Sequence, residues 1–117
     1  QLANVFSAAE NALLVTAAAG NYVWIGGTDA ASEGTWVWSP SGKPLSYTNW
    51  NPGQPNSWRG TNQDCLAFNW GSPGKWDDNT CTYKHKYVCQ TPPSPPPPPP
   101  PPQLYTLMNE ALSWSDA

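Results

Sequence analysis

Charged residues are scarce in this chain, and basic residues are the scarcest. Its 117 residues include five Lys or Arg and eight Asp or Glu, which gives a net charge of −3. Nucleic-acid binding requires clusters of Lys and Arg that neutralise phosphates, so this acidic balance argues against a nucleic-acid partner. The sequence also lacks any run of 18 apolar residues, and we therefore expect no membrane-spanning helix.

Recognisable catalytic patterns are missing as well. The single histidine, His85, has no nucleophile at a recognisable spacing, and the three scattered cysteines do not form a zinc pattern. Asp77 and Asp78 are adjacent, but neighbouring strand residues point to opposite faces, whereas the two carboxylates of a glycosidase face each other across a bond. We therefore predict that the chain is not an enzyme.

Tryptophan, in contrast, is abundant, with eight residues in a chain long enough for one domain. Indole rings bury much surface and still need a partner for the N–H group, so the composition suits a compact, loop-rich fold. The tryptophans expected in its core are Trp24, Trp36, Trp38, Trp50 and Trp70. A short helix is predicted over residues 8–18. Ser7 and Glu10 have capping-box spacing, apolar residues then recur at helical spacing, and Gly20 can end the helix in a left-handed conformation.

Short apolar stretches predict five strands, with a long polar region between the second and the third. Residues 39–64 are rich in Pro, Gly, Asn and Ser, which predicts loops, and long ordered loops in a compact domain are usually functional. Together these elements indicate an α+β domain. The predicted strands cover residues 22–25, 35–38, 65–69, 75–77 and 83–90.

Three short motifs concentrate amide and carboxylate oxygens in and beside this polar region. They are Gln54-Pro55-Asn56, Gln63-Asp64-Cys65 and Trp76-Asp77-Asp78. Calcium prefers six to eight oxygen ligands from carboxylates, amides and carbonyls, and the hydroxyls of a sugar can complete such a shell. The motifs therefore predict a calcium-dependent sugar-binding module.

The order of motifs resembles the C-type lectin-like domain over residues 1–90. The resemblance implies a fold of short helices packed on small antiparallel sheets, with a long ligand-binding loop region. Seven landmarks occur in the family's order: Trp24–Gly27, Glu33–Trp38, Tyr47–Trp50, Asn51–Asn56, Asp64–Cys65, Lys75–Asp78 and Tyr87–Cys89.

The resemblance also implies a ligand set for a calcium ion at the sugar site. The Gln54–Pro55 bond is expected to be cis. An amide stands at Gln63 where the family usually has Glu, and fewer carboxylates mean weaker binding, with a dissociation constant of about 10⁻⁴–10⁻³ M. The implied calcium ligands are Gln54, Asn56, Gln63, Asp77 and Asp78.

The residues implied to contact the sugar overlap with the calcium ligands. They are Gln54, Asn56 and Asp77, and Trp58 could stack on the apolar face of a sugar or pack within the loop. In the family, Glu-Pro-Asn accompanies mannose-type sugars and Gln-Pro-Asp galactose-type sugars. The Gln-Pro-Asn of this chain matches neither, so no sugar is assigned.

A second calcium site of the family would use other positions. It would use Asp29, Glu33 and Ser57, with Gln63 and Asp64 nearby. Ser57 and Gln63 lack the expected carboxylates, so we expect this site to be empty and the segment around Glu33 to be a structural turn.

The odd cysteine count permits either free thiols or a disulfide with one cysteine left over. The resemblance pairs Cys65 with Cys81. The family's other bridge joins Cys89 to a cysteine in the first helix, and this sequence has none there. Cys89 is therefore free or has a partner outside these residues. A disulfide implies an oxidising setting, so we expect a secreted protein, at a cell surface or in an extracellular fibre.

Residues 91–103 have a different composition and include eight consecutive prolines, Pro95–Pro102. Such a tract favours polyproline II, at about 3.1 Å per residue, and predicts a stiff linker. Its Ser-Pro-Pro composition resembles the hydroxyproline-rich, O-glycosylated segments of plant and green-algal wall proteins.

Residues 104–117 resemble the opening of a C-type lectin-like domain, with a first strand around Tyr105 and the start of the first helix. Residues 1–90 lack this first strand and first helix. Two interpretations remain open. The chain is one frame of a tandem array, or separate chains associate head to tail, each donating its last segment to a neighbour. We do not expect the segment to fold back on its own domain, because a polyproline rod does not reverse.

The expected partners are therefore glycans and neighbouring copies. The alternative function is a structural building block of a glycosylated extracellular fibril, without calcium-dependent sugar binding.

Overall fold

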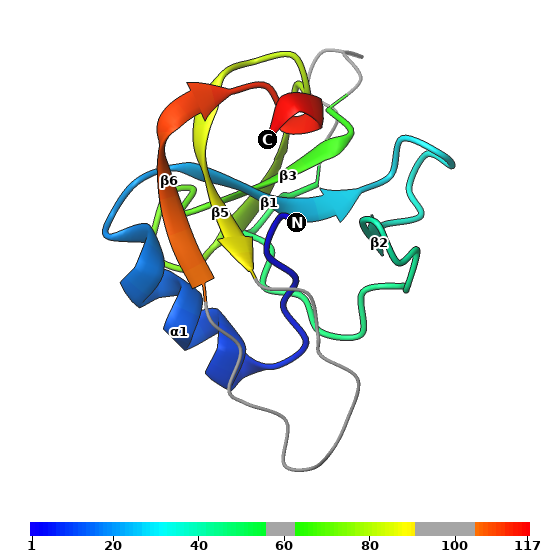
Figure 1. Cartoon of the computed structure of the whole chain (residues 1–117). Helices are drawn as coiled ribbons and strands as arrows, with labels where there is room; N and C mark the ends of the chain where they lie inside the picture. The colour runs from blue at the N-terminus through cyan, green and yellow to red at the C-terminus, as the bar shows by residue number, and fades with distance from the viewer. Residues whose placement is uncertain (56–62, 91–104) are drawn as a thin grey trace, which may run out of the picture.

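The computed structural model describes residues 1–55, 63–90 and 105–117. In this part of the chain one α-helix and one 3₁₀ turn accompany a six-stranded sheet (Figure 1). The α+β class predicted from the sequence is confirmed. The elements are α1 (Ala8–Ala18), β1 (Val23–Thr28), β2 (Val37–Trp38), β3 (Cys65–Phe68), β4 (Trp76–Asn79), β5 (His85–Gln90), β6 (Tyr105–Leu112) and the 3₁₀ helix η2 (Trp114–Asp116).

The sheet is mixed rather than antiparallel, and this corrects the expectation of small antiparallel sheets. Its strand order is β4-β3-β1-β5-β6, with β2 paired to β1. The strands β1 and β5 run parallel, with Val23 opposite Lys86, while the other pairs are antiparallel. A parallel pair needs a long crossover, which the chain from β2 through β4 provides.

The helix α1 has the predicted bounds and the predicted cap. Ser7 Oγ accepts a hydrogen bond from the Glu10 N–H at 3.1 Å, and Glu10 Oε1 accepts one from the Phe6 N–H at 2.8 Å. The first bond satisfies an N–H group that the first turn of a helix leaves without a partner, and the second ties Phe6, just before the cap, to that turn. Asn11, Leu14 and Ala18 form the buried face of the helix.

Trp76 is the centre of the main hydrophobic core. It is fully buried, and its ring meets Trp38, Tyr47 and Trp50 at centroid distances of 5.8, 5.9 and 5.7 Å. The indole N–H donates to Asn11 Oδ1 at 2.9 Å, so its polar group is satisfied inside the core. The helix, β4 and the polar loop region are therefore joined through one side chain.

Most of the other tryptophans expected in the core are there. Trp24 is fully buried on the opposite face of the sheet, and Trp36 and Trp50 pack against the main core. Trp70 is the exception, because it is 45% exposed in the turn that follows β3. The expectation that Trp70 belongs to the core is wrong.

The last described segment pairs within its own chain, which differs from the expectation that it would not fold back. The strand β6 lies antiparallel to β5, with Thr106 opposite Cys89 and Leu107 opposite Val88 (Figure 1). Pairing satisfies the backbone groups along the β5 edge and buries apolar side chains of β6. A strand begins at Tyr105 as predicted, and a 3₁₀ turn stands where the start of a helix was expected. The predicted polyproline linker, residues 91–103, lies outside the described residues.

We predict that Asn11→Ala lowers the free energy of unfolding by about 2 kcal/mol. The substitution leaves the buried Trp76 indole N–H and the Gly74 carbonyl without their side-chain partner, and each unsatisfied buried group costs about 1–3 kcal/mol. Urea unfolding measures the change. Leu13→Ala is the matched control, since Leu13 lies on the same helix and is 50% exposed, and equal losses in the two variants would contradict the prediction.

Candidate functional site

Three carboxylates converge where β1 ends and β3 begins. One oxygen from each of Asp29, Glu33 and Asp64 lies within 4.8 Å of the other two. Since β1 and β3 are antiparallel, with Thr28 opposite Cys65, the residues that follow β1 and precede β3 meet at one edge. The pairing of two strands thus assembles an acidic cluster from residues far apart in the sequence.

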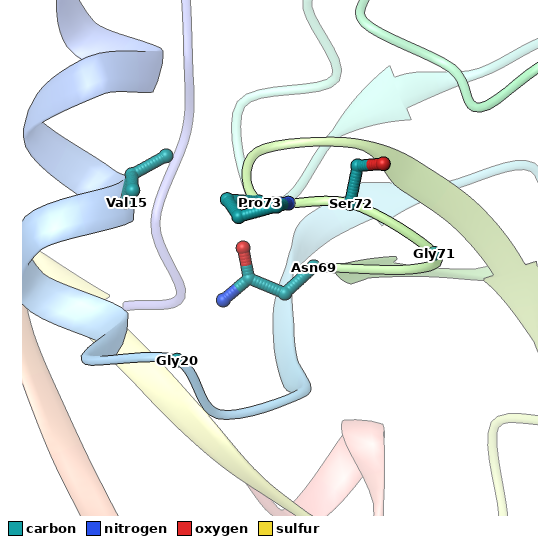
Figure 2. A pocket seen from close by; sticks show the side chains of 6 residues that line it. All are labelled: Val15, Gly20, Asn69, Gly71, Ser72 and Pro73. Carbon is teal, nitrogen blue, oxygen red and sulfur yellow. The ribbon is translucent and has the colours of Figure 1, made fainter.

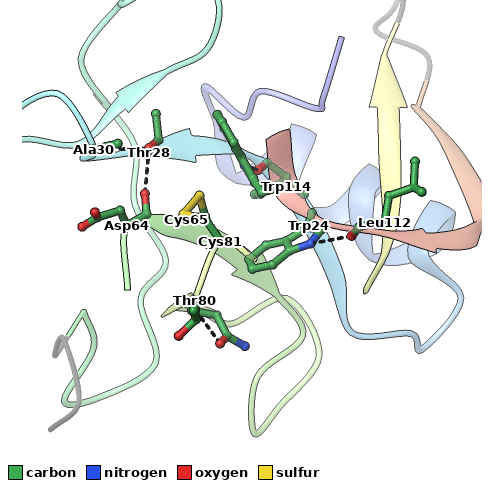
Figure 3. Close-up of a disulfide and its surroundings, with 11 residues drawn as sticks. Trp24, Thr28, Ala30, Asp64, Cys65, Thr80, Cys81, Leu112 and Trp114 are labelled. Carbon is green, nitrogen blue, oxygen red and sulfur yellow. Dashed lines mark hydrogen bonds between the residues drawn. A yellow bond between two sulfur atoms is a disulfide. The ribbon is translucent and has the colours of Figure 1, made fainter. Parts of the chain in front are cut away.

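Backbone hydrogen bonds hold this acidic cluster in place. The Asp64 carbonyl accepts from the Asp29 N–H at 3.1 Å and from Thr28 Oγ1 at 2.7 Å, the second shown in Figure 3. Asp29 Oδ2 accepts from the Gly34 N–H at 2.9 Å, which closes the turn that carries Glu33. The turn expected around Glu33 is therefore present, and it also brings a carboxylate to the cluster.

Asp29 is buried, at 4% exposure, and its environment disfavours its charged form. The pKa of Asp29 is raised to about 7, mainly by burial and also by the carboxyl groups of Glu33 and Asp64, while the hydrogen bond from the Gly34 N–H opposes the rise. Asp29 Oδ1 has no hydrogen-bond partner within the described residues. A buried acceptor without a donor is costly, and a divalent cation bound by oxygen ligands would satisfy it. The donor set fits calcium.

The implied sugar site begins in the loop beside β4. Asn51 N–H donates to the Trp76 carbonyl at 2.9 Å, and Gln54 N–H donates to the Asn51 carbonyl at 2.9 Å, so the loop is tied to the start of β4. The Gln54–Pro55 peptide bond is cis. Gln54 Oε1 is buried and has no hydrogen-bond partner in the part of the chain that the structure describes. It is the second such acceptor beside the polar loop region.

The two aspartates of β4 do not act as a side-by-side pair. They occupy successive strand positions, so their side chains point to opposite faces. Asp78 is 2% exposed, while both carboxylate oxygens of Asp77 accept from Tyr22 Oη, at 2.6 and 2.8 Å. Burial raises the pKa of Asp77 to about 7, which the Tyr22 hydrogen bond opposes. A calcium ion using Asp77 would share it with Tyr22, a partner that the sequence did not suggest.

The remaining sequence-predicted site residues are placed only in part. Gln63 is half-buried just before β3, and Asn56, Ser57 and Trp58 lie outside the described residues. From the sequence, a calcium site here is expected to be empty, because Ser57 and Gln63 lack carboxylates, and Asp64 is expected only near it. Asp29 follows one strand and Asp64 precedes another. Pairing these two strands antiparallel would have predicted that the two residues meet.

A hollow of about 410 Å³ lies elsewhere, between the end of α1 and the turn after β3 (Figure 2). Among the residues that line it, Asn69 carries a side-chain amide. This amide donates to the Asn21 carbonyl at 2.7 Å and accepts from the Gly74 N–H at 2.9 Å. Because Asn69 already has partners within the fold, this hollow offers little to a ligand.

The sequence profile of the Lectin C-type domain matches residues 1–91. The chain belongs to the C-type lectin family. It is 37% identical over 92 residues to lectin BRA-3 of Megabalanus rosa, covering 78% of this chain and 55% of that protein. It is 36% identical over 81 residues to the versican core protein of Bos taurus, covering 69% of this chain and 2% of that protein. The chain thus spans about half of one relative and a small part of the other.

Solved structures show the same C-type lectin fold. The cow C-type carbohydrate-recognition domain of CD23, solved in the presence of GlcNAc2Man3 oligosaccharide, superposes with a TM-score of 0.61 at 36% identity. The match covers 69% of this chain and 60% of that one. The family assignment predicted from the seven landmarks is confirmed.

The disulfide implied by the family resemblance is confirmed. Cys65 and Cys81 are bonded, with a Cα–Cα distance of 5.3 Å, and join the start of β3 to the residues after β4 (Figure 3). Cys89 is a half-buried free thiol in β5. Within residues 1–55, 63–90 and 105–117, no helix has the length and apolarity needed to cross a bilayer.

We predict that, in a chelating buffer, the protein unfolds more easily at pH 7 than at pH 5. Folded Asp29 and Asp77 keep their protons up to about pH 7, whereas both lose them near pH 3.8 when unfolded. The folded state therefore binds more protons between these values, and its stability falls as the pH rises through this window. Urea unfolding at several pH values measures the decline.

Asp29→Asn should make this decline shallower, because only the contribution of Asp77 remains. Asparagine keeps an acceptor for the Gly34 N–H. Asp116→Asn is the control, since Asp116 is exposed on η2. A decline that is unchanged by Asp29→Asn would show that the acidic cluster does not titrate in this way.

Proposed function

We propose that this chain is an extracellular carbohydrate-binding module that binds calcium weakly and is not an enzyme. The observation that carries the proposal is the convergence of Asp29, Glu33 and Asp64 around an unpartnered buried oxygen. This cluster belongs to a domain of the C-type lectin family. The disulfide between Cys65 and Cys81 supports an oxidising, secreted setting.

The acidic cluster is the stronger of two calcium-binding sets. Its three carboxylates carry a formal charge of −3, whereas Gln54, Asn56, Gln63, Asp77 and Asp78 include two carboxylates. Ligand charge raises calcium affinity, and one of those two carboxylates, Asp77, is already bound by Tyr22. We therefore place the first calcium ion at the acidic cluster, where it would tie the end of β1 to the start of β3.

The sugar would bind at the loop that carries Gln54. The buried Gln54 Oε1, which lacks a protein partner in the described structure, supports a ligand there. The proposed sugar contacts are Gln54, Asn56 and Asp77, with Trp58 as a stacking surface. Calcium at this position would supply a Lewis-acidic centre that accepts sugar hydroxyls. The protein residues would hold that ion and orient the sugar on it.

We predict that calcium stabilises the protein and that Asp64→Asn removes most of this effect. A ligand at ten times its dissociation constant adds about 1.4 kcal/mol to the free energy of unfolding. Isothermal titration at millimolar calcium and thermal unfolding with and without chelator measure the binding. Asp116→Asn should behave as wild type. Unchanged calcium binding in Asp64→Asn would place the ion elsewhere, and no binding in the wild-type chain would remove calcium from the proposal.

We predict that glycan binding depends on calcium and on Gln54. A glycan array probed with calcium and with chelator should show signals that calcium restores, and Gln54→Ala should weaken them at least tenfold while leaving calcium binding at the acidic cluster intact. Gln103→Ala is the control, because it changes the same residue type after the proline tract. Signals that persist in chelator would exclude the calcium-dependent mechanism.

A second candidate function is structural, and the C-terminal segment favours it. Residues 105–117 pack as a strand and a 3₁₀ turn, and the sequence before them is rich in proline. We propose that the modules repeat or assemble head to tail through residues 91–103, which would carry O-linked glycans, and so build an extracellular fibre or cell-surface layer. Electron microscopy of native material that shows only single particles would argue against it.

A further inference from the structure

Residues 105–117 complete the domain formed by residues 1–90. Trp114 Nε1 donates to the Ile25 carbonyl at 2.8 Å, and Trp24 Nε1 donates to the Leu112 carbonyl at 3.1 Å. Tyr105 Oη donates to the Asn4 carbonyl at 2.7 Å. Figure 3 shows Trp114 and Trp24 beside the disulfide that joins β3 to the turn after β4. Without this segment, the fully buried indole of Trp24 would lose its acceptor.

The same segment contributes apolar side chains to both faces of the sheet. Tyr105 and Leu107 pack against the main core around Trp76, while Met108, Leu112 and Trp114 pack against the second core that contains Trp24. Its backbone covers the β5 edge, with Gln90 paired to Tyr105 and His85 to Leu112. An uncovered edge of this kind is a template for another strand, so the domain requires this segment from some source.

The register of β5 and β6 requires the connection between them to start and end at neighbouring strands. Gln90 and Tyr105 are direct partners, so the chain leaves and re-enters the sheet at neighbouring strands, about 4.8 Å apart. The intervening sequence contains eight consecutive prolines, which favour an extended form about 25 Å long. If β6 docks on a second copy, it makes the same hydrogen bonds, and the chain does not have to turn back to its own sheet. Identical elements exchange between protomers under this condition.

The contacts of η2 give the direction of such an exchange. Ala117 and Trp114 line one hollow of about 220 Å³ together with Gln1 and Leu2. A donated segment would therefore bring residues 114–117 of one copy beside residues 1 and 2 of the next, which is a head-to-tail arrangement.

We propose that residues 105–117 are an exchangeable donor strand, and that β6 and η2 of one chain dock on the β5 edge and the Trp24 face of a second copy. The exchanged strand makes the same contacts that it makes within the single chain. The stiffness of the proline tract favours docking on a second copy over docking on the same chain. The inference rests on the assembly part of the proposed function and is independent of calcium and sugar binding.

Thr106→Cys tests the exchange in the full chain. Thr106 is exposed and lies opposite the free Cys89, and opposite residues in antiparallel strands have Cβ atoms about 4.5–5.5 Å apart. Mild oxidation should link the two positions. Exchange predicts dimers and higher multiples on a non-reducing gel, whereas linked monomers or an absence of links would overturn the proposal.

Two controls make the cross-linking specific. Thr106→Ser should give no multiples. Asn109→Cys adds an exposed thiol on the same strand that has no cysteine opposite it, so multiples as abundant as those of Thr106→Cys would indicate random oxidation and overturn the proposal.

A second variant tests the role of the prolines. Replacing Pro95–Pro102 in the Thr106→Cys chain with eight Gly and Ser residues should shift the links toward monomers, because a flexible connection can return. An unchanged ratio of links within chains to links between chains would show that the proline tract does not determine the partner of β6. If native material forms assemblies but the disulfides of the Thr106→Cys chain lie within single chains, the strand exchange is wrong. The head-to-tail assembly of the proposed function is then unaffected.

Discussion

The buried indole of Trp76 is the contact on which the rest of this structure depends. Its N–H is held by Asn11 of α1, and its ring packs against Trp38, Tyr47 and Trp50. The backbone of the same residue accepts from Asn51 and donates to Asn49. One side chain therefore sets the positions of the helix, of β4 and of the loop that leads to Gln54. The polar loop region can be rich in Pro and Gly because its anchors lie in the core.

The same arrangement places oxygen-bearing side chains at the ends of strands and in an anchored loop. The strand β1 ends at Thr28, just before Asp29, and its antiparallel partner β3 begins just after Asp64. The loop anchored at β4 leads to Gln54. Two of these residues have buried oxygen atoms without partners in the described structure. A fold that places unsatisfied acceptors at strand ends gains stability when a cation or a sugar hydroxyl arrives. In the proposed calcium-bound state, ligand binding and folding would therefore be coupled.

Local patterns in the sequence were reliable where the physics is local. The Ser7–Glu10 capping box predicted α1 to the residue, because a cap depends on neighbours three positions apart. The ordered landmarks of the C-type lectin family predicted the fold and the bond between Cys65 and Cys81. Exposure of Trp70 was missed, because composition cannot tell which tryptophan lies in a turn.

The sequence by itself determined the family, the helix, the positions of the strands and the set of oxygen-bearing side chains. Tertiary structure alone decided which of them meet: Asp29 with Asp64 across β1 and β3, Asp77 with Tyr22, and β6 with the β5 edge. These contacts join residues between 35 and 55 positions apart, or on either side of the proline tract. Such pairings follow from strand register and from the face to which each side chain points, and these become defined only when the whole sheet has formed.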